Sequence, residues 1–133
     1  MEILALDVGH KRVGIARASI EARLAEPLKT VKTAEAIEEL RKIVKENGVK
    51  TIVAGLPRNL SGEDTQQTRW VRDFVAKAKS ELGVTFYWQD EALTSHEAMK
   101  HETRNMKHDV DAEAAAIILG DFLAADKNDW VLV

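Results

Sequence analysis

Short apolar runs alternate along this chain with longer stretches whose apolar residues follow helical spacing. The first run, Ile3–Leu6, stops at Asp7, and a second run, Val13–Ala16, follows after a short polar link. Apolar runs of this length that end at charged residues or glycine are typical of buried strands, and the short link predicts a hairpin. A third strand is expected within Ala25–Val31, where Pro27 favours a sheet edge or a bulge.

Strands and helices alternate after this hairpin. A helix is expected over Ala34–Asn47 with Thr33 as its N-cap, and a fourth strand over Thr51–Ala54. The later elements are expected to be a helix over about Glu63 to Leu82, a strand over Val84–Trp88, a helix starting at the Thr94/Glu97 capping box, a loop over Lys100–His108 and a last helix from near Asp111. Three strands followed by alternating strands and helices predict a mixed α/β sheet with helices on its faces.

The composition limits what kind of protein this can be. A chain of 133 residues with 45% hydrophobic content predicts a single domain over residues 1–133. No apolar run approaches a membrane span and cysteine is absent, so we expect a soluble cytoplasmic protein. The net charge of −3 argues against coating nucleic acid by bulk electrostatics. Residues 80–133 carry eleven Asp/Glu against four Lys/Arg, an excess that a bound cation would offset.

Acidic residues stand at three places where a predicted apolar element meets solvent. Asp7 follows the first strand, Asp90 and Glu91 follow the fifth, and Asp111 begins the last helix. Open α/β sheets bind ligands at the carboxyl ends of their strands, and like charges gathered there need a cation. Carboxylate oxygens suit Mg²⁺ or Mn²⁺, and two such ions about 4 Å apart catalyse phosphoryl displacement. The spacing alone also allows Asp7 as a turn residue and Asp111 as a helix cap.

Four segments together resemble the YqgF-type family, whose members are named for Holliday-junction resolution or for cleavage of pre-16S ribosomal RNA. They are Leu4–Ala16, Ile52–Gly62, Asp90–Ser95, and Asp111 with Ala114–Leu119. The resemblance implies an RNase H-like fold in which a five-stranded mixed sheet, ordered 3-2-1-4-5, is flanked by helices. It also implies an acidic site for Mg²⁺ or Mn²⁺, expected as two ions, at Asp7, the Asp90–Glu91 pair and Asp111.

The middle acid is a choice between two neighbours. Strand alternation puts Asp90 and Glu91 on opposite faces, so only one of them is expected to be a ligand. The family pattern favours Glu91, and catalysis is therefore assigned to Asp7, Glu91 and Asp111. The chain departs from that pattern at Ala92, where the family usually has Arg, and at His10, where it often has Thr or Ser.

Basic and polar residues near these acids are the candidate substrate contacts. Lys11 and Arg12 lie on the first turn beside Asp7, and Arg58 and Asn59 follow the fourth strand. Trp70 follows the apolar periodicity of its helix and is expected in the core. The four histidines show no ligand spacing, and no histidine metal site is predicted.

Three functions from different classes fit this pattern. The first is a metal-dependent endonuclease for structured nucleic acid, acting in 5′ processing of precursor 16S rRNA, with four-way DNA as the alternative substrate. The second is a nucleotide-binding relative of the actin-like ATPases, whose first phosphate loop is similar to Asp7–Gly14. The third is a non-catalytic nucleic-acid-binding module. The partner is expected to be pre-rRNA or branched DNA, with the protein a monomer or a homodimer, and resolution of a junction requires a dimer.

Overall fold

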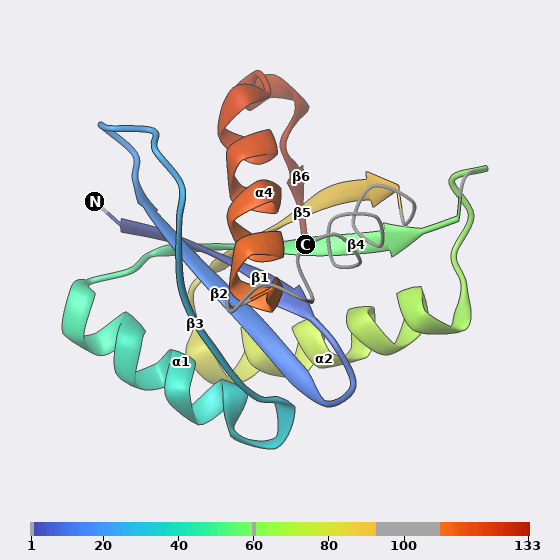
Figure 1. Cartoon of the computed structure of the whole chain (residues 1–133), viewed down its shortest axis with the longest axis horizontal. Coiled ribbons are helices and arrows are strands. Elements are labelled where there is room, and N and C mark those ends of the chain that lie inside the picture. The colour runs from blue at the N-terminus through green and yellow to red at the C-terminus, as the bar shows by residue number, and fades with distance from the viewer. Residues whose placement is uncertain (1, 60, 93–109) are drawn as a thin grey trace.

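The computed structural model describes residues 2–59, 61–92 and 110–133, which form a six-stranded mixed sheet with helices on both faces (Figure 1). The strands are β1 (Glu2–Val8), β2 (Arg12–Ser19), β3 (Glu26–Lys32), β4 (Thr51–Arg58), β5 (Thr85–Ala92) and β6 (Val131–Leu132). The helices are α1 (Thr33–Asn47), α2 (Gln66–Leu82) and α4 (Val110–Ala124), with a 3₁₀ turn, η1, over Lys127–Asp129. Within these described residues, no helix has the length and apolar character needed to cross a membrane.

The sheet is ordered β3-β2-β1-β4-β5-β6, which confirms the predicted order of the first five strands. β1 is antiparallel to β2 and parallel to β4, and β4 is parallel to β5. The predicted count of five strands was wrong, because Val131–Leu132 forms a sixth strand antiparallel to β5. Two residues are too short to produce a periodic signal, so this strand depends on pairing with an edge that already exists.

Alternation of side chains along the strands divides the apolar residues between two cores. Leu4 and Leu6 of β1 face α1 and α2, whereas Ile3 and Ala5 face α4. α4 is apolar around most of its circumference and lies alone on its face of the sheet among the described helices (Figure 1). Odd-numbered positions of β1 therefore point toward α4, and Asp7 continues that series.

Two helix starts differ from the sequence prediction. Thr33 was expected to be an N-cap, but it is the first residue of α1, and its hydroxyl donates to the carbonyl oxygen of Gly9 at 2.7 Å. α2 begins at Gln66 and not near Glu63, because Thr65 caps it through a reciprocal pair of hydrogen bonds with Thr68. A threonine that bonds outside its own helix cannot be separated from a cap by sequence.

The remaining element boundaries follow the predictions with a few shifts. The strands extend one to four residues beyond the apolar runs, β5 begins at Thr85, and α4 begins at Val110 as expected. Pro27 lies on edge strand β3, where the register with β2 shifts between Ile15 and Ala16, so the predicted edge or bulge is confirmed. The Thr94/Glu97 helix start and the Lys100–His108 loop lie outside the described residues.

The backbone of α4 approaches β2 most closely at Gly14. A Cβ atom placed on Gly14 would lie 1.9 Å from the carbonyl oxygen of Asp111 and 2.7 Å from the amide nitrogen of Ala112. Both atoms are backbone, so neither can rotate away as a side chain would. Gly14 is therefore the position that lets the first turn of α4 lie directly on the sheet.

Replacing Gly14 by alanine should destabilise the protein by about 3 kcal/mol, because the added methyl group overlaps the backbone of α4. Gly120→Ala, in α4, is the control. Nothing lies within 4 Å of its added Cβ, and alanine should stabilise the helix by up to about 1 kcal/mol. Urea unfolding of both variants measures the difference. Equal stability of Gly14→Ala and wild type would contradict the close packing.

Candidate active site

Asp7 lies near the carboxyl end of central strand β1, on the face that α4 covers. It pairs with Gly14 of antiparallel strand β2, and continuing the β1–β4 register places it level with Gly55. Its Oδ2 atom is buried. Asp7 thus lies between two glycines on the neighbouring strands, so no Cβ atom of either strand stands beside its carboxylate.

Both flanking glycines are contact points for α4. The added Cβ at Gly14 would overlap the backbone of Asp111, and at Gly55 it would lie 2.5 Å from Cδ1 of Ile118. The same row of residues therefore holds Asp7 and seats the first three turns of α4, from Asp111 to Ile118. This packing brings Asp111 next to the strand that pairs with Asp7.

The end of β5 carries two acids that point in opposite directions. Tyr87 contacts the α4-side core and Trp88 the other core, so alternation directs Glu91 toward the α4 face and Asp90 away from it. Oε1 of Glu91 is buried, whereas the Asp90 side chain is 59% exposed and lies 3.4 Å from Nε of Arg58. Glu91 thus shares a face with Asp7 and Asp111, and Asp90 does not.

Arg12 forms an ion pair with the last of these acids. Its Nε donates to Oδ2 of Asp111 at 2.8 Å, and the two side chains are 64% and 17% exposed. Arg12 lies two residues before Gly14 on β2 and so points to the same face. The guanidinium supplies positive charge at the rim of an acidic site and remains accessible to solvent.

The fit to a divalent ion is good in chemistry and incomplete in geometry. Three carboxylates on one face, two with a buried oxygen, are the hard donors that Mg²⁺ and Mn²⁺ prefer. Across residues 2–59, 61–92 and 110–133, however, no three His, Asp or Glu side chains are grouped closely enough to hold a metal ion. The ion pair with Arg12 occupies Oδ2 of Asp111 in this arrangement.

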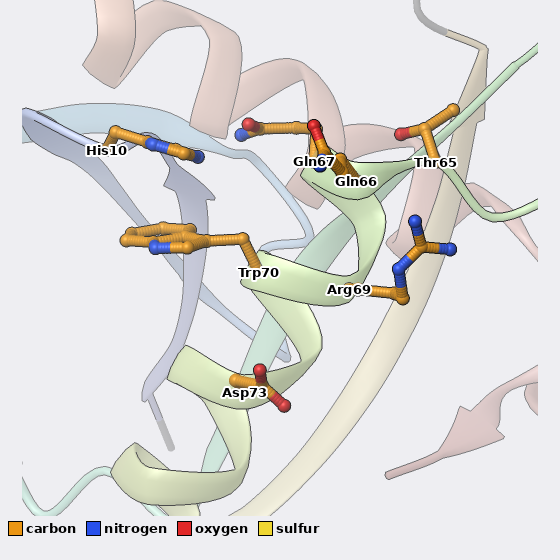
Figure 2. A pocket seen from close by; sticks show the side chains of 7 residues that line it. All are labelled: His10, Thr65, Gln66, Gln67, Arg69, Trp70 and Asp73. Atoms are coloured by element: carbon orange, nitrogen blue, oxygen red, sulfur yellow. The ribbon is translucent and has the colours of Figure 1, made fainter.

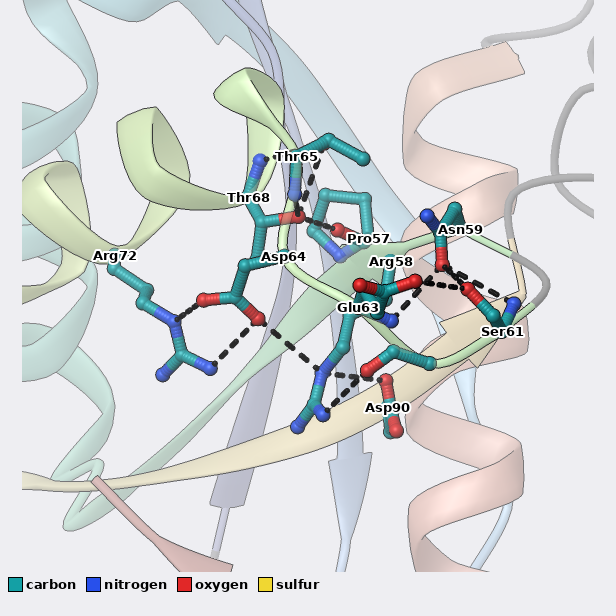
Figure 3. A network of polar contacts seen from close by, with 11 residues as sticks. Pro57, Arg58, Asn59, Ser61, Glu63, Asp64, Thr65, Thr68, Arg72 and Asp90 are labelled. Carbon is teal, nitrogen blue, oxygen red and sulfur yellow. Dashed lines mark hydrogen bonds and ion pairs between the residues drawn. The ribbon is translucent and has the colours of Figure 1, made fainter.

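The loop after β4 is held by its own polar network (Figure 3). The Asn59 side-chain oxygen accepts from the amides of Ser61 and Glu63, at 3.1 and 2.9 Å. Arg58 lies between Asp90 and Asp64, and its Nη1 donates to the carbonyl oxygen of Gly62 at 3.1 Å. Arg58 and Asn59, two of the four residues predicted to contact substrate, thus fix the shape of this loop.

Asp64 is the acidic centre of the network. Arg72 donates to it from two nitrogens, at 2.8 and 3.3 Å, and lies over the ring of Trp88 at 5.5 Å. These hydrogen bonds, reinforced by the charges of Arg72, Arg58 and Arg69, hold the pKa of Asp64 below its ordinary value of 3.8. The network ties the start of α2 to the ends of β4 and β5.

The structure also contains a pocket that the sequence did not indicate (Figure 2). It lies beside the turn between β1 and β2, where His10 stacks on Trp70 of α2 with ring centroids 4.2 Å apart. Trp70 was predicted to be core, and it is half-buried against the core with one face covered by His10. The helical periodicity of the sequence indicated only that Trp70 packs on the core, and no signal in the sequence linked Trp70 to His10.

Comparison with known proteins places this arrangement in a fold class. The Thermus thermophilus RuvC structure aligns with a TM-score of 0.63 at 15% identity over the whole of both chains, and RuvC in complex with a Holliday junction substrate gives 0.61 at 16%. At this level of identity the likeness shows the fold alone. The chain has the RNase H-like α/β fold of RuvC, and the sheet formed by its described residues has six strands.

Sequence relatives define the family within that class. A protein of Chloroflexus aggregans is 38% identical over 96% of both chains, and one of Fusobacterium nucleatum is 32% identical over 93% of this chain and 97% of its own. Both carry the name "Putative pre-16S rRNA nuclease". The family model described as RuvX, Holliday junction resolvase, matches residues 1–125. The chain belongs to this RuvX nuclease family, which confirms the resemblance inferred from the sequence.

Replacing Arg72 by glutamine should raise the pKa of Asp64 toward 3.8, because it removes the charged donor that favours the carboxylate. A group with a depressed folded pKa stabilises the native state above its unfolded pKa, and that contribution is lost as the pH falls through the folded value. Carboxyl titration by NMR measures the shift. Lys77→Gln on the same helix should leave Asp64 unchanged, and an unchanged titration in Arg72→Gln would contradict the assignment.

Proposed function

We propose that residues 1–133 act as one nuclease domain that hydrolyses phosphodiester bonds, with Asp7, Glu91 and Asp111 as its catalytic carboxylates. The observation that carries the proposal is their common face: alternation directs Asp7 and Glu91 toward α4, and the contact at Gly14 holds Asp111 on the same face, next to the strand that pairs with Asp7. Membership of a nuclease family supports the same reaction. Asp90, on the other face and paired with Arg58, is assigned no catalytic role.

The same three carboxylates are the proposed ligands of divalent metal, Mg²⁺ or Mn²⁺, as two ions. Bound there, the metal would supply the acidity that activates water and the charge that stabilises the leaving oxygen. A metal ion held by Asp111 would compete with Arg12 for this carboxylate, whose Oδ2 accepts from Nε of Arg12. The proposal therefore has Arg12 exchange a carboxylate for a substrate phosphate, an anion that its planar guanidinium binds equally well.

Basic residues around the turn between β1 and β2 would position the substrate backbone. Lys11 is exposed next to Arg12, and both lie at the edge of the acidic face. Arg58 and Asn59 are proposed to serve the substrate by shaping the loop that follows β4, since their side chains already bind that loop. Phosphate contacts fix register and orientation, and carry no sequence information directly.

Precursor 16S rRNA, cut during 5′ processing, is the proposed substrate. The curated relatives from several bacterial genera carry a name that specifies this RNA, at 30–38% identity. The proposed compartment is the cytoplasm, where bacteria transcribe ribosomal RNA. A Holliday junction is the second candidate, because the matching family model is described by that activity. Paired junction cuts require two active sites, so this alternative predicts a homodimer, whereas RNA processing is compatible with a monomer.

Asp7→Asn and Glu91→Gln should each lower Mg²⁺- or Mn²⁺-dependent cleavage of a pre-16S rRNA 5′-leader transcript by a hundredfold or more, since each removes a proposed metal ligand. Asp90→Asn is the matched control, because it changes the adjacent residue in the same way on the opposite face. It should stay within about twofold of wild type, as an exposed pair contributes little. Single-turnover cleavage rates measure all three.

Three results would contradict the assignment. Loss of activity in Asp90→Asn with retention in Glu91→Gln would exchange the two roles. Wild type that binds RNA but never cleaves it in Mg²⁺ or Mn²⁺ would indicate a non-catalytic binding module. Faster cleavage of a four-way DNA junction than of the leader transcript, by a protein that is dimeric in light scattering, would favour the resolvase reading.

Lys11→Ala should weaken RNA binding in EDTA and reduce the slope of log K against log salt by about 1, as expected for one lost phosphate contact. Lys45→Ala, at the far end of α1, is the control and should leave the slope unchanged. Fluorescence anisotropy over a salt series measures both slopes. Identical slopes in the two variants would remove Lys11 from the proposed interface.

A further inference from the structure

The open pocket of about 780 Å³ beside the turn between β1 and β2 lies outside the acidic face (Figure 2). Its lining combines two aromatic rings with amide, hydroxyl and charged side chains. These residues are His10, Thr65, Gln66, Gln67, Arg69, Trp70 and Asp73. A pocket that offers aromatic faces together with hydrogen-bond donors and acceptors suits a flat heteroaromatic ligand.

The aromatic part is a stack of three rings that runs from the core to the surface. Phe74 and Trp70 are 5.9 Å apart with an interplanar angle of 18°, and Trp70 and His10 are 4.2 Å apart with an angle of 23°. Phe74 and Trp70 pack against the main core, whereas His10 is exposed. The stack therefore has an anchored inner end and an outer end formed by an imidazole ring.

The backbone that carries His10 is held on both sides. Gly9 donates to the carbonyl oxygen of Arg12 at 2.9 Å and accepts from the Thr33 hydroxyl at 2.7 Å. The Thr33 amide donates to the carbonyl oxygen of Lys11 at 2.9 Å. The exposed ring thus sits on a turn fixed by α1, so a ligand that stacks on it orders little additional structure.

This turn also connects the pocket to the acidic site. His10 contacts Trp70 of α2 on one face of the sheet, and Arg12, two residues later, contacts Asp111 of α4 on the other. A nucleic-acid strand that crosses the turn would have its backbone near Arg12 and a base within reach of His10. The amides of Gln66 and Gln67 lie at the same end of the pocket as His10 (Figure 2).

We propose that His10 and Trp70 form a stacking platform for an unpaired nucleobase, with Gln66 and Gln67 facing the edge of that base and Arg69 facing its backbone. The platform rests on the proposed nuclease function, and it implies that the substrate has a single-stranded segment next to the cleaved bond. Single strands are recognised by stacking of bases on aromatic side chains and by hydrogen bonds to their exposed edges.

The test measures binding separately from cleavage. Single-stranded RNA and DNA oligonucleotides of ten nucleotides and the same sequence are titrated with the protein in EDTA. Each carries a 2-aminopurine at one position, and a matched oligonucleotide is abasic at that position. His10→Ala should weaken binding of the base-containing strand about tenfold, the effect of losing one stacked base. It should also abolish the quenching of 2-aminopurine, and its affinity for the abasic strand should equal that of wild type.

Controls separate stacking from damage to the fold. His10 is exposed, so His10→Ala should unfold like wild type, and His10→Tyr should restore binding because tyrosine also offers a flat ring. Trp70→Phe, which retains an aromatic ring in the stack, should lose less than His10→Ala. Ser80→Ala, an exposed neutral site near the other end of α2, should bind normally.

Each outcome decides the proposal. Equal binding by His10→Ala and wild type, equal affinity for abasic and base-containing strands, or no binding of either strand by wild type would overturn the platform. Tighter binding of RNA than DNA assigns it to an RNA strand, and the reverse to a DNA strand. Cleavage by wild type and its loss in Asp7→Asn, measured in Mg²⁺, would leave the nuclease proposal standing even if the platform fails.

Discussion

The contact between the backbone of α4 and Gly14 of β2 determines the relation between the two ends of this chain. Asp7 and Asp111 are separated by most of the sequence, and they come together because a helix lies directly on a strand that has no Cβ at that point. On the other side of β1, Gly55 makes room for the Ile118 side chain of the same helix. Interiors packed at this density respond to a change of one methyl group, so stability and site geometry depend on the same atoms.

Charge is arranged around this contact on two separate faces. On the α4 face, Arg12 offsets Asp111 at the edge of the buried acids. On the opposite face, Arg58 and Arg72 offset Asp90 and Asp64 and fix the loop that leads into α2. The neighbouring acids of β5 therefore belong to different electrostatic environments, one organised around the proposed metal site and the other around loop structure.

Much of this could be read from the sequence, because the signals were local. Apolar runs ending in acids predicted the strands and the position of Asp7, and the matching segments predicted the strand order and the family. The preference for Glu91 over Asp90 came from the family pattern, because alternation along β5 does not say which face α4 covers. The stack of His10 on Trp70 joins a turn to a helix 60 residues later, and neither residue alone distinguishes a platform from ordinary packing.

Other misses have equally physical causes. Thr33 was expected to cap α1, but its hydroxyl is used to hold the turn at Gly9. Thr65, which caps α2, was not singled out from the sequence. Arg58 and Asn59 stay predicted substrate residues, and the structure adds that their polar atoms bind the loop after β4, a contact that the sequence did not reveal. The two-residue strand β6 exists only because β5 offers an edge.

The two borders of the sheet are blunted in different ways. On one side β3 carries Pro27 and a register shift, together with Lys29 and Lys32, and on the other side the outermost strand is only two residues long. Proline, lysine and short strands are devices that discourage a second molecule from adding a strand of its own. Self-association of this nuclease by a continuous β-sheet is thereby disfavoured.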